Sequence, residues 1–248
     1  MISDFCVHRE ECGGCTYQGV PYEEQLSIKS EMTLHAMRNQ RINIGHYEGI
    51  KESPKKYSYR NKMEYTFGNE VKDGEMNLGL HKAGRFMSVV TTDQCQIVDP
   101  DFNRILSETL SFSRKKGYLF YHKKNHIGFL RNLVLRKGER TGEILINLVT
   151  STQDILDYEQ FVKQILSLEL EHKIIGILHT ENDKKADAVG SDRIKILFGR
   201  DHYFEEIMNL RFRVGANSFF QTNIEAVERL YREAIDIIPD IKGKIVFD

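Results

Sequence analysis

The sequence lacks any apolar run that approaches the roughly 20 residues needed to cross a membrane. It also lacks an overall charge, because 35 Lys and Arg residues stand against 36 Asp and Glu residues. The first absence excludes a membrane-spanning protein and favours a cytoplasmic one. The second gives no global sign of nucleic-acid binding. A hydrophobic content of 40% and a charged content of 29% are typical of an ordinary globular protein.

Cysteine is scarce as well, with four residues, and their spacing is informative. Cys6, Cys12 and Cys15 form a C-x5-C-x2-C run, and Cys95 is the fourth. Four thiols complete a tetrahedral metal site or hold one cubane iron–sulfur cluster. The two glycines between Cys12 and Cys15 allow the backbone to bend tightly around such a centre.

Three interpretations of these cysteines compete. Disulfide pairing is disfavoured because no secretory segment precedes Cys6. Structural zinc sites usually have two close pairs of ligands, and here only Cys12 and Cys15 make a close pair. Three clustered thiolates with one remote thiolate are common in iron–sulfur proteins. The spacing therefore leans towards a cluster and leaves zinc open.

Further motifs accompany the cysteines and carry a resemblance to a known family. In chain order they are Pro21-Tyr22-x-x-Gln25-Leu26-x-x-Lys29, Tyr59-Arg60-Asn61-Lys62, Leu78-Gly79-Leu80-His81, Leu130-Arg131-Asn132 and Asn217-Ser218-Phe219-Phe220-Gln221-Thr222-Asn223. With the cysteine run, they resemble the RumA/TrmA-type RNA (uracil-5-)-methyltransferases over essentially the whole chain. The resemblance implies a [4Fe–4S] cluster on Cys6, Cys12, Cys15 and Cys95, with S-adenosylmethionine as the methyl donor.

The resemblance also implies a reaction. In these enzymes a cysteine thiolate adds to carbon 6 of uracil, carbon 5 takes the methyl group, and a glutamate removes the carbon 5 proton. All four cysteines here belong to the cluster pattern, so the catalytic cysteine and base are expected beyond Asp248. Gln221 is expected to contact the cofactor. We therefore expect the N-terminal part of an enzyme acting on rRNA, in preference to tRNA, and no activity from these residues alone.

The pattern of elements predicts an α+β fold, with a largely antiparallel sheet and flanking helices. Helices are expected at 21–41, 102–116 and 152–170, and strands at 57–67, 77–80, 86–90, 131–135, 143–149, 173–180, 193–198, 203–207 and 210–214. A capping box at Thr222–Glu225 begins a helix that ends near Ile238, and a strand follows at Lys244–Asp248.

The resemblance divides the chain in two. It implies a cluster- and RNA-binding domain at 1–212, followed at 213–248 by the first helix and strand of a truncated Rossmann-like methyltransferase domain. The last helix would then lack the sheet on which it should pack. Self-association is one way in which its apolar stripe could be covered.

Charge is unevenly distributed along the chain. Residues 111–140 hold nine Lys and Arg residues against Glu139 alone, a net of +8. This stretch predicts a cationic face that attracts an RNA backbone, and solvated strand edges are the alternative. The expected RNA contacts are Arg60, Lys62, His81, Lys123, Lys124 and Arg131.

A different class of function fits much of the same evidence. A stand-alone iron–sulfur or zinc RNA-binding module without catalysis would need the same cysteines and cations. Coding sequence past Asp248 with a glycine-rich loop and a Pro-Cys nucleophile motif would favour the enzyme.

Overall fold

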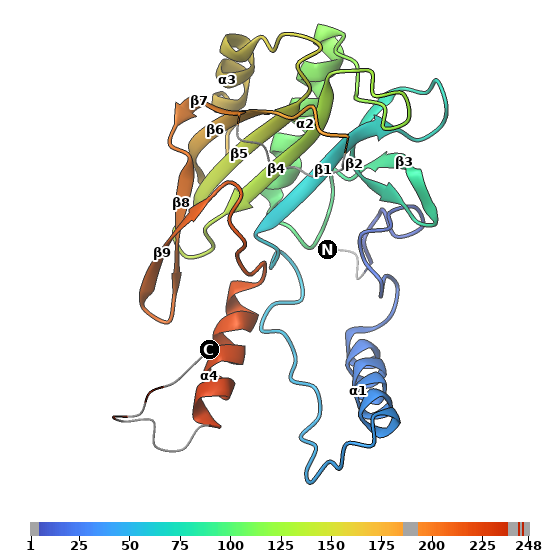
Figure 1. The fold of residues 1–248 in the computed structure, drawn as a ribbon, viewed down its shortest axis with the longest axis vertical. Coiled ribbons are helices and arrows are strands. Elements are labelled where there is room, and N and C mark those ends of the chain that lie inside the picture. The colour runs from blue at the N-terminus through green and yellow to red at the C-terminus, as the bar shows by residue number, and fades with distance from the viewer. Residues whose placement is uncertain (1–4, 186–192, 238–242, 244, 246–248) are drawn as a thin grey trace.

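The computed structural model describes residues 5–185, 193–237, 243 and 245 (Figure 1). In chain order the elements are α1 (Tyr22–Asn39), β1 (Lys62–Asn69), β2 (Met76–Lys82), β3 (Arg85–Thr91), α2 (Pro100–Lys116), β4 (Leu130–Lys137), β5 (Glu143–Thr150), α3 (Tyr158–Leu166), β6 (Lys173–Glu181), β7 (Arg193–Gly199), β8 (His202–Ile207), β9 (Leu210–Gly215) and α4 (Ile224–Asp236). Every helix and strand predicted before residue 237 has a counterpart among them.

Seven strands form one sheet in the order β3-β2-β1-β4-β5-β6-β7, and β8 and β9 form a separate two-stranded sheet. Neighbouring strands of the large sheet run antiparallel, except for β5 and β6, which run parallel. Parallel neighbours need a crossover connection, and α3 lies in the one between β5 and β6. The predicted α+β fold with a largely antiparallel sheet is therefore confirmed.

The main core lies between the large sheet and the helices α2 and α3 (Figure 1). Alternate side chains of β1 point into it, among them Tyr65, and α2 contributes Phe102 and Ile105 from one stripe. Phe112 of α2 and Phe161 of α3 meet with their ring centroids 5.2 Å apart. Burial of each side chain of this size stabilises the fold by about 1.5–3 kcal/mol, which holds both helices on this face.

The start and end of α2 follow from specific side chains. Asp99 precedes the helix and accepts a hydrogen bond from the Asp101 backbone N–H at 2.9 Å. Gly117 ends the helix with a φ of 69°, which glycine adopts without the steric cost that a Cβ would bring. The predicted helix at 102–116 was therefore placed two residues late at its start.

Two other elements begin later in the structure than the sequence predicts. α3 starts at Tyr158 rather than near Thr152, because Asp157 is its N-cap and accepts from the Gln160 backbone N–H at 3.2 Å. β1 starts at Lys62, since residues 58–60 instead pair with the segment at 96–98.

The predicted capping box at the start of α4 is also wrong by one residue. Asn223 caps the helix, and its side chain accepts from the Ala226 backbone N–H at 3.1 Å. Thr222 precedes the cap. The strand predicted at Lys244–Asp248 lies almost entirely outside the described residues.

A smaller core lies between the β8–β9 hairpin and the strands β5 and β6. Its buried members are Leu145, Leu178, Tyr203 and Val214. Next to it, Ile224 and Val227 of α4 pack against Ile207 of β8. Position 213, where the sequence places the start of the second domain, lies within β9.

α1 and α4 extend from the same end of the large sheet, with the 40–61 segment between them (Figure 1). α1 buries none of its residues. α4 is held to the 40–61 segment by polar contacts, including Lys51 with Glu233 at 2.5 Å. Among the described residues, no helix is long and apolar enough to cross a bilayer.

Candidate functional site

The N-terminal loop at 5–20 lies against the β2–β3 hairpin. The Gly13 backbone N–H donates to the His81 carbonyl at 2.9 Å, and that of Ala83 donates to the Glu11 carbonyl at 2.7 Å. Cys12, between these two contacts, is buried. Backbone pairing thus fixes the position of Cys12 at the end of the hairpin.

Cys95 approaches from the segment between β3 and α2. Asn103 of α2 holds its backbone twice, since the Asn103 Oδ1 accepts from the Cys95 N–H at 3.3 Å and the Asn103 Nδ2 donates to the Cys95 carbonyl at 3.1 Å. The next residues are held as well, because the Arg60 N–H donates to the Ile97 carbonyl at 2.8 Å. The remote cysteine therefore sits on a well-anchored segment.

The four thiols lie close enough to affect one another electrostatically. Burial raises the pKa of Cys12, and the neighbouring Cys15 and Cys6 raise it further. Burial likewise raises the pKa of Cys95 to about 11, with added contributions from the other three cysteines. The structure thus brings the four predicted ligands together. A cationic centre among them would offset this repulsion and favour the thiolate forms.

The two glycines of the cysteine run lie in close contact with the β2–β3 hairpin, and a Cβ at Gly13 would lie 3.0 Å from the His81 carbonyl oxygen. A Cβ at Gly14 would lie 2.6 Å from Cδ1 of Leu80 and 3.3 Å from Sγ of Cys12. The Gly14 N–H also donates to that sulfur, at 3.3 Å. Hydrogen bonds of this kind stabilise thiolate ligands and adjust the potential of a cluster. The donor set and its N–H contact fit an iron–sulfur cluster.

The separation of the sulfur atoms bears on the choice between zinc and a cluster. Tetrahedral zinc with Zn–S bonds of about 2.3 Å places its sulfurs about 3.8 Å apart. Within the described part of the chain, no three cysteine sulfurs lie within 4.8 Å of one another. Zinc and a cluster are therefore the two candidate occupants of these cysteines.

A second group of metal-type ligands lies nearby, at the start of α2. Ligand atoms of Asp99, Asp101 and His172 lie within 4.8 Å of one another. Asp99 already pairs with Lys137 at 2.6 Å, however, and Asp101 accepts from the His172 backbone N–H at 2.8 Å and lies 3.0 Å from its Nδ1. We interpret this group as structural, because cations and N–H groups already satisfy its oxygens.

Arg131, predicted to bind RNA, lies inside the fold. It is 6% exposed, and its Nη1 donates to the carbonyls of Asn182 and Lys184 at 2.6 and 2.8 Å. Its guanidinium also stacks over the Tyr121 ring, 4.4 Å from the centroid. The structure therefore gives Arg131 a role in packing, and the prediction that it belongs to an exposed cationic face is wrong.

Arg60 and Lys62 occupy different surroundings. Arg60 lies near the thiols, and its charge lowers the pKa of Cys15 against the larger raising effects of burial and of Cys6. Its Nε donates to the Lys62 carbonyl at 3.0 Å. Lys62 pairs with Glu64 at 2.6 Å. Arg60 is thus placed to balance negative charge at the cysteines.

The remaining predicted RNA contacts lie at the outer end of the β2–β3 hairpin. The His81 ring stacks on Phe86 with centroids 4.8 Å apart, and the Lys123 ammonium lies 4.9 Å from the same ring centroid. Lys124 follows Lys123 in the chain and is exposed. The structure therefore brings two predicted contacts, His81 and Lys123, together around an exposed aromatic ring.

The stretch at 111–140 does not form one cationic face. Three of its cations are buried in β4, namely Arg131, Arg136 and Lys137. Three others form ion pairs, Arg114 with Glu75, Lys116 with Asp157 and Arg140 with Glu228. Counting charge along the sequence overestimated the charge available at the surface.

Gln221, the predicted cofactor contact, lies exposed between β9 and α4. Phe219, two residues before it, is 86% exposed, whereas Phe220 packs against both smaller hydrophobic clusters. The segment thus presents a polar and an aromatic side chain to solvent.

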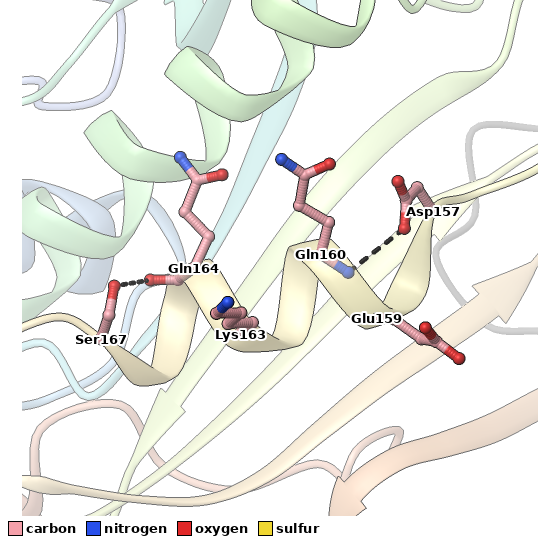
Figure 2. Close-up of a pocket in the computed structure, with 6 residues that line it drawn as sticks. All are labelled: Asp157, Glu159, Gln160, Lys163, Gln164 and Ser167. Atoms are coloured by element: carbon pink, nitrogen blue, oxygen red, sulfur yellow. Dashed lines mark hydrogen bonds between the residues drawn. The ribbon is translucent and has the colours of Figure 1, made fainter.

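A hollow of about 630 Å³ lies along α3. Figure 2 shows its lining side chains, Asp157, Glu159, Gln160, Lys163, Gln164 and Ser167, all from this one helix and its ends. Asp157 caps the helix and pairs with Lys116, and Gln164 donates to Glu108 of α2. These contacts fix α3 on α2, and we assign the hollow no chemistry.

Several curated proteins described as uncharacterized RNA methyltransferases match nearly the whole chain. One from Caldanaerobacter subterraneus subsp. tengcongensis is 45% identical over 243 residues, which is 98% of this chain and 54% of the relative. One from Clostridium tetani is 43% identical over 243 residues, covering 98% of this chain and 53% of the relative. The chain is thus similar over nearly its whole length to curated RNA methyltransferases. It spans about half the length of these relatives.

The fold has a solved counterpart among the methyltransferases. The structure of Pyrococcus abyssi tRNA (uracil-54, C5)-methyltransferase, in complex with S-adenosyl-L-homocysteine, matches 96% of this chain and 52% of that chain. The TM-score is 0.71 and the sequence identity is 24%, so the likeness shows a shared fold over the matched region. No protein-family model matches the chain.

Sequence reasoning missed the residues that support the site. Asn103 anchors the Cys95 backbone, and Lys137 neutralises Asp99 a few residues further along the chain. Neither residue carries a distinctive spacing or motif. Their roles depend on the approach of segments that are remote from one another in the sequence.

Proposed function

We propose that this chain is the cluster-binding and RNA-binding part of an S-adenosylmethionine-dependent RNA (uracil-5-)-methyltransferase. The methyl acceptor would be carbon 5 of a uridine in rRNA or tRNA. One observation carries the proposal, the convergence of Cys6, Cys12, Cys15 and Cys95 in a chain that is similar over nearly its whole length to curated RNA methyltransferases.

The four cysteines would hold a [4Fe–4S] cluster. Support comes from the Gly14 N–H directed at Cys12 and from the positive charge of Arg60 beside Cys15. When bound, the cluster would cross-link the N-terminal loop to the segment that leads into α2. Its proposed role is therefore to stabilise the arrangement of these two segments.

The proposed RNA contacts are those that stand near the surface. They are His81 and Lys123, around the exposed ring of Phe86, and the exposed Lys124, which follows Lys123 in the chain. Aromatic rings and cations in this arrangement suit the stacking of an unpaired base and the neutralisation of its phosphate. Lys62 would have to exchange Glu64 for a phosphate to take part.

The catalytic groups are proposed to lie in the region of the relatives that this chain does not span. All four cysteines are assigned to the cluster, which leaves no thiol for addition to carbon 6 of the uridine. We keep residues 1–212 as the cluster- and RNA-binding domain, residues 213–248 as the beginning of the catalytic domain, and Gln221 as a cofactor contact. A single amide contact contributes only about 0.5–1.5 kcal/mol.

The test measures RNA binding and methyl transfer by the same preparation. The 248-residue chain, loaded anaerobically, is expected to bind unmodified rRNA or tRNA transcripts without transferring tritium from labelled S-adenosylmethionine. Titration calorimetry is expected to detect no micromolar cofactor binding. Any turnover, or micromolar affinity for the cofactor, would contradict the assignment of the catalytic groups. Failure to bind either RNA would contradict the RNA-binding role.

A further inference from the structure

The cations that the structure leaves at the surface include a group on the β8–β9 hairpin. Arg211 stacks over the Phe204 ring, with its guanidinium carbon 4.0 Å from the ring centroid. Arg200 lies 4.9 Å from the same centroid and is anchored by Glu143 at 2.5 Å. Arg213 follows on the same strand and is 64% exposed. The hairpin thus presents an aromatic ring with stacked guanidinium groups.

A hollow of about 480 Å³ lies between this hairpin and β7. Its lining residues are Leu178, Ile194, Ile196, Asp201, Gly215, Ala216, Asn217 and Ser218. This volume lies within the range of sites that hold small molecules of nucleoside size. Ile194 and Ile196 of β7 form an apolar wall of the hollow, and Asn217 and Ser218 form its polar side.

The apolar wall arises from the position of β7 at the edge of the sheet. Lys195 lies over the Tyr158 ring at the start of α3, 4.1 Å from its centroid, so alternate residues of β7 face the opposite side. On that side, Ile194 and Ile196 are 36% and 49% exposed. Two branched apolar side chains beside Asn217 and Ser218 match a nucleobase, which has apolar faces and polar edges.

The hollow adjoins the exposed cations of the β8–β9 hairpin. Asp201 lines the hollow and pairs with Arg213 at 3.4 Å. Both side chains of this pair are largely exposed, and exposed pairs are weak enough to be exchanged for a phosphate. Arg213 therefore stands at the rim, where the backbone of a nucleotide seated in the hollow would emerge.

We propose that the corner formed by β7 and the β8–β9 hairpin binds a single-stranded segment of RNA, with a base in the hollow and phosphates on Arg211 and Arg213. The inference rests on the proposed function, since it takes RNA as the ligand class. The alternative occupant is a peptide strand added to the open edge of β7. The charge of Arg211 and Arg213 favours RNA, because a peptide backbone carries no compensating negative charge.

The experiment measures anisotropy of a fluorescein-labelled 12-nucleotide oligouridylate over a range of salt concentrations. The double variant Arg211→Gln/Arg213→Gln is expected to bind about tenfold more weakly at low salt. It should also lose about 1.4 from the slope of log affinity against log salt, since each phosphate contact on a single strand contributes about 0.7. Ile196→Glu is expected to weaken binding about tenfold by placing a charge where the base stacks.

Two variants provide matched controls. Lys115→Gln/Lys163→Gln removes two exposed cations from α2 and α3, and Ile155→Glu changes an isoleucine that is 85% exposed. Both are expected to bind as the wild type does. Equal losses in the control and test variants, or wild-type binding by the test variants, would overturn the inference while leaving RNA binding in place.

Photocrosslinking gives a second measurement that needs no substitution. A probe containing 4-thiouridine is expected to crosslink to peptides within 193–218. Crosslinks confined to other segments would overturn the inference. Absence of any binding by the wild type would overturn the RNA-binding part of the proposed function, and this inference with it.

Discussion

Two corners of the molecule hold groups that bind metals, yet they differ in how those groups are satisfied. The thiol corner comprises Cys6, Cys12, Cys15 and Cys95. The carboxylate corner comprises Asp99, Asp101, Glu139 and His172, and it begins four residues after Cys95. In the thiol corner burial raises the pKa of Cys12 and Cys95, and neighbouring cysteines raise it further. In the carboxylate corner the carboxylate oxygens already form ion pairs with cationic side chains.

Lys137 forms two of the ion pairs in the carboxylate corner. Its ammonium is buried and lies 2.6 Å from Asp99 and 2.9 Å from Glu139. Burial alone would lower the pKa of Lys137, but these two hydrogen bonds outweigh burial and raise it. Lys55 adds a further contact to Glu139 at 2.6 Å. Ligand type alone therefore does not identify a metal site. Lysines pair directly with the carboxylates, whereas burial and neighbouring thiols raise the pKa of Cys12 and Cys95.

The largest expected effect comes from removing one thiol. Cys95→Ser should abolish the visible iron–sulfur absorbance of anaerobically prepared protein, because a cluster with three thiolate ligands loses the anchor to α2. Absorbance and bound iron measure the change. Gln94→Ser, one residue away in the same segment, is the control and should keep both. Retention of full iron content by Cys95→Ser would remove this cysteine from the site.

Removing the buried cation should break the carboxylate corner without affecting cluster assembly. Lys137→Met is expected to lower the free energy of unfolding by about 3–5 kcal/mol, since it leaves the buried Asp99 without its lysine partner and removes one of the two lysines that pair with Glu139. Urea denaturation measures the loss. Lys115→Met, on the exposed side of α2, should change stability by less than about 0.5 kcal/mol. Equal stability of the two variants would show that the corner does not depend on this pair.

The carboxylate corner should also give a pH dependence. Burial raises the pKa of Glu139, but hydrogen bonds from Lys55 and Lys137 outweigh it and hold the pKa below its ordinary value. The stabilisation is therefore present above about pH 4.3, the unfolded value, and is lost as the pH falls through the lower folded value. Glu139→Gln should be less stable than wild type at pH 6, by about 1–3 kcal/mol. The difference should shrink towards pH 3, and a pH-independent difference would contradict this account.

The smallest expected effect concerns the support of the thiol corner. Asn103→Ala removes two hydrogen bonds to the Cys95 backbone, each worth about 0.5–1.5 kcal/mol. We expect the cluster to assemble but to lose iron to a chelator several times faster than in wild type. Ser107→Ala, on the same helix, is the control. Identical rates would show that Asn103 does not position the ligand.

Cysteine spacing is a local signal, and the four thiols that it singles out approach one another in the structure. Their role as cluster ligands stays a prediction. The sequence also predicted the strand and helix order, which depends on local periodicity. It predicted the charged face poorly. Arg131 and Lys137 belong to β4, a strand that is buried on both faces. Nothing in the sequence indicates that Arg131 donates to the Asn182 carbonyl or that Lys137 pairs with Asp99.

The carboxylate corner was beyond sequence reasoning for a similar reason. Asp99 and Asp101 precede the helix predicted at 102–116 and carry no metal-ligand spacing, and His172 lies 71 residues after Asp101 in the chain. Their meeting depends on the packing of the α3–β6 connection against the start of α2. A tertiary contact of this kind leaves no periodic signal in a single sequence.

The central claim is that the thiol corner holds an iron–sulfur cluster, and elemental analysis tests it most directly. Protein produced with sufficient iron and purified without oxygen should contain about four iron and about four acid-labile sulfide per chain. The same preparation should contain little zinc. Stoichiometric zinc with no sulfide would contradict the claim and make the corner a structural zinc site.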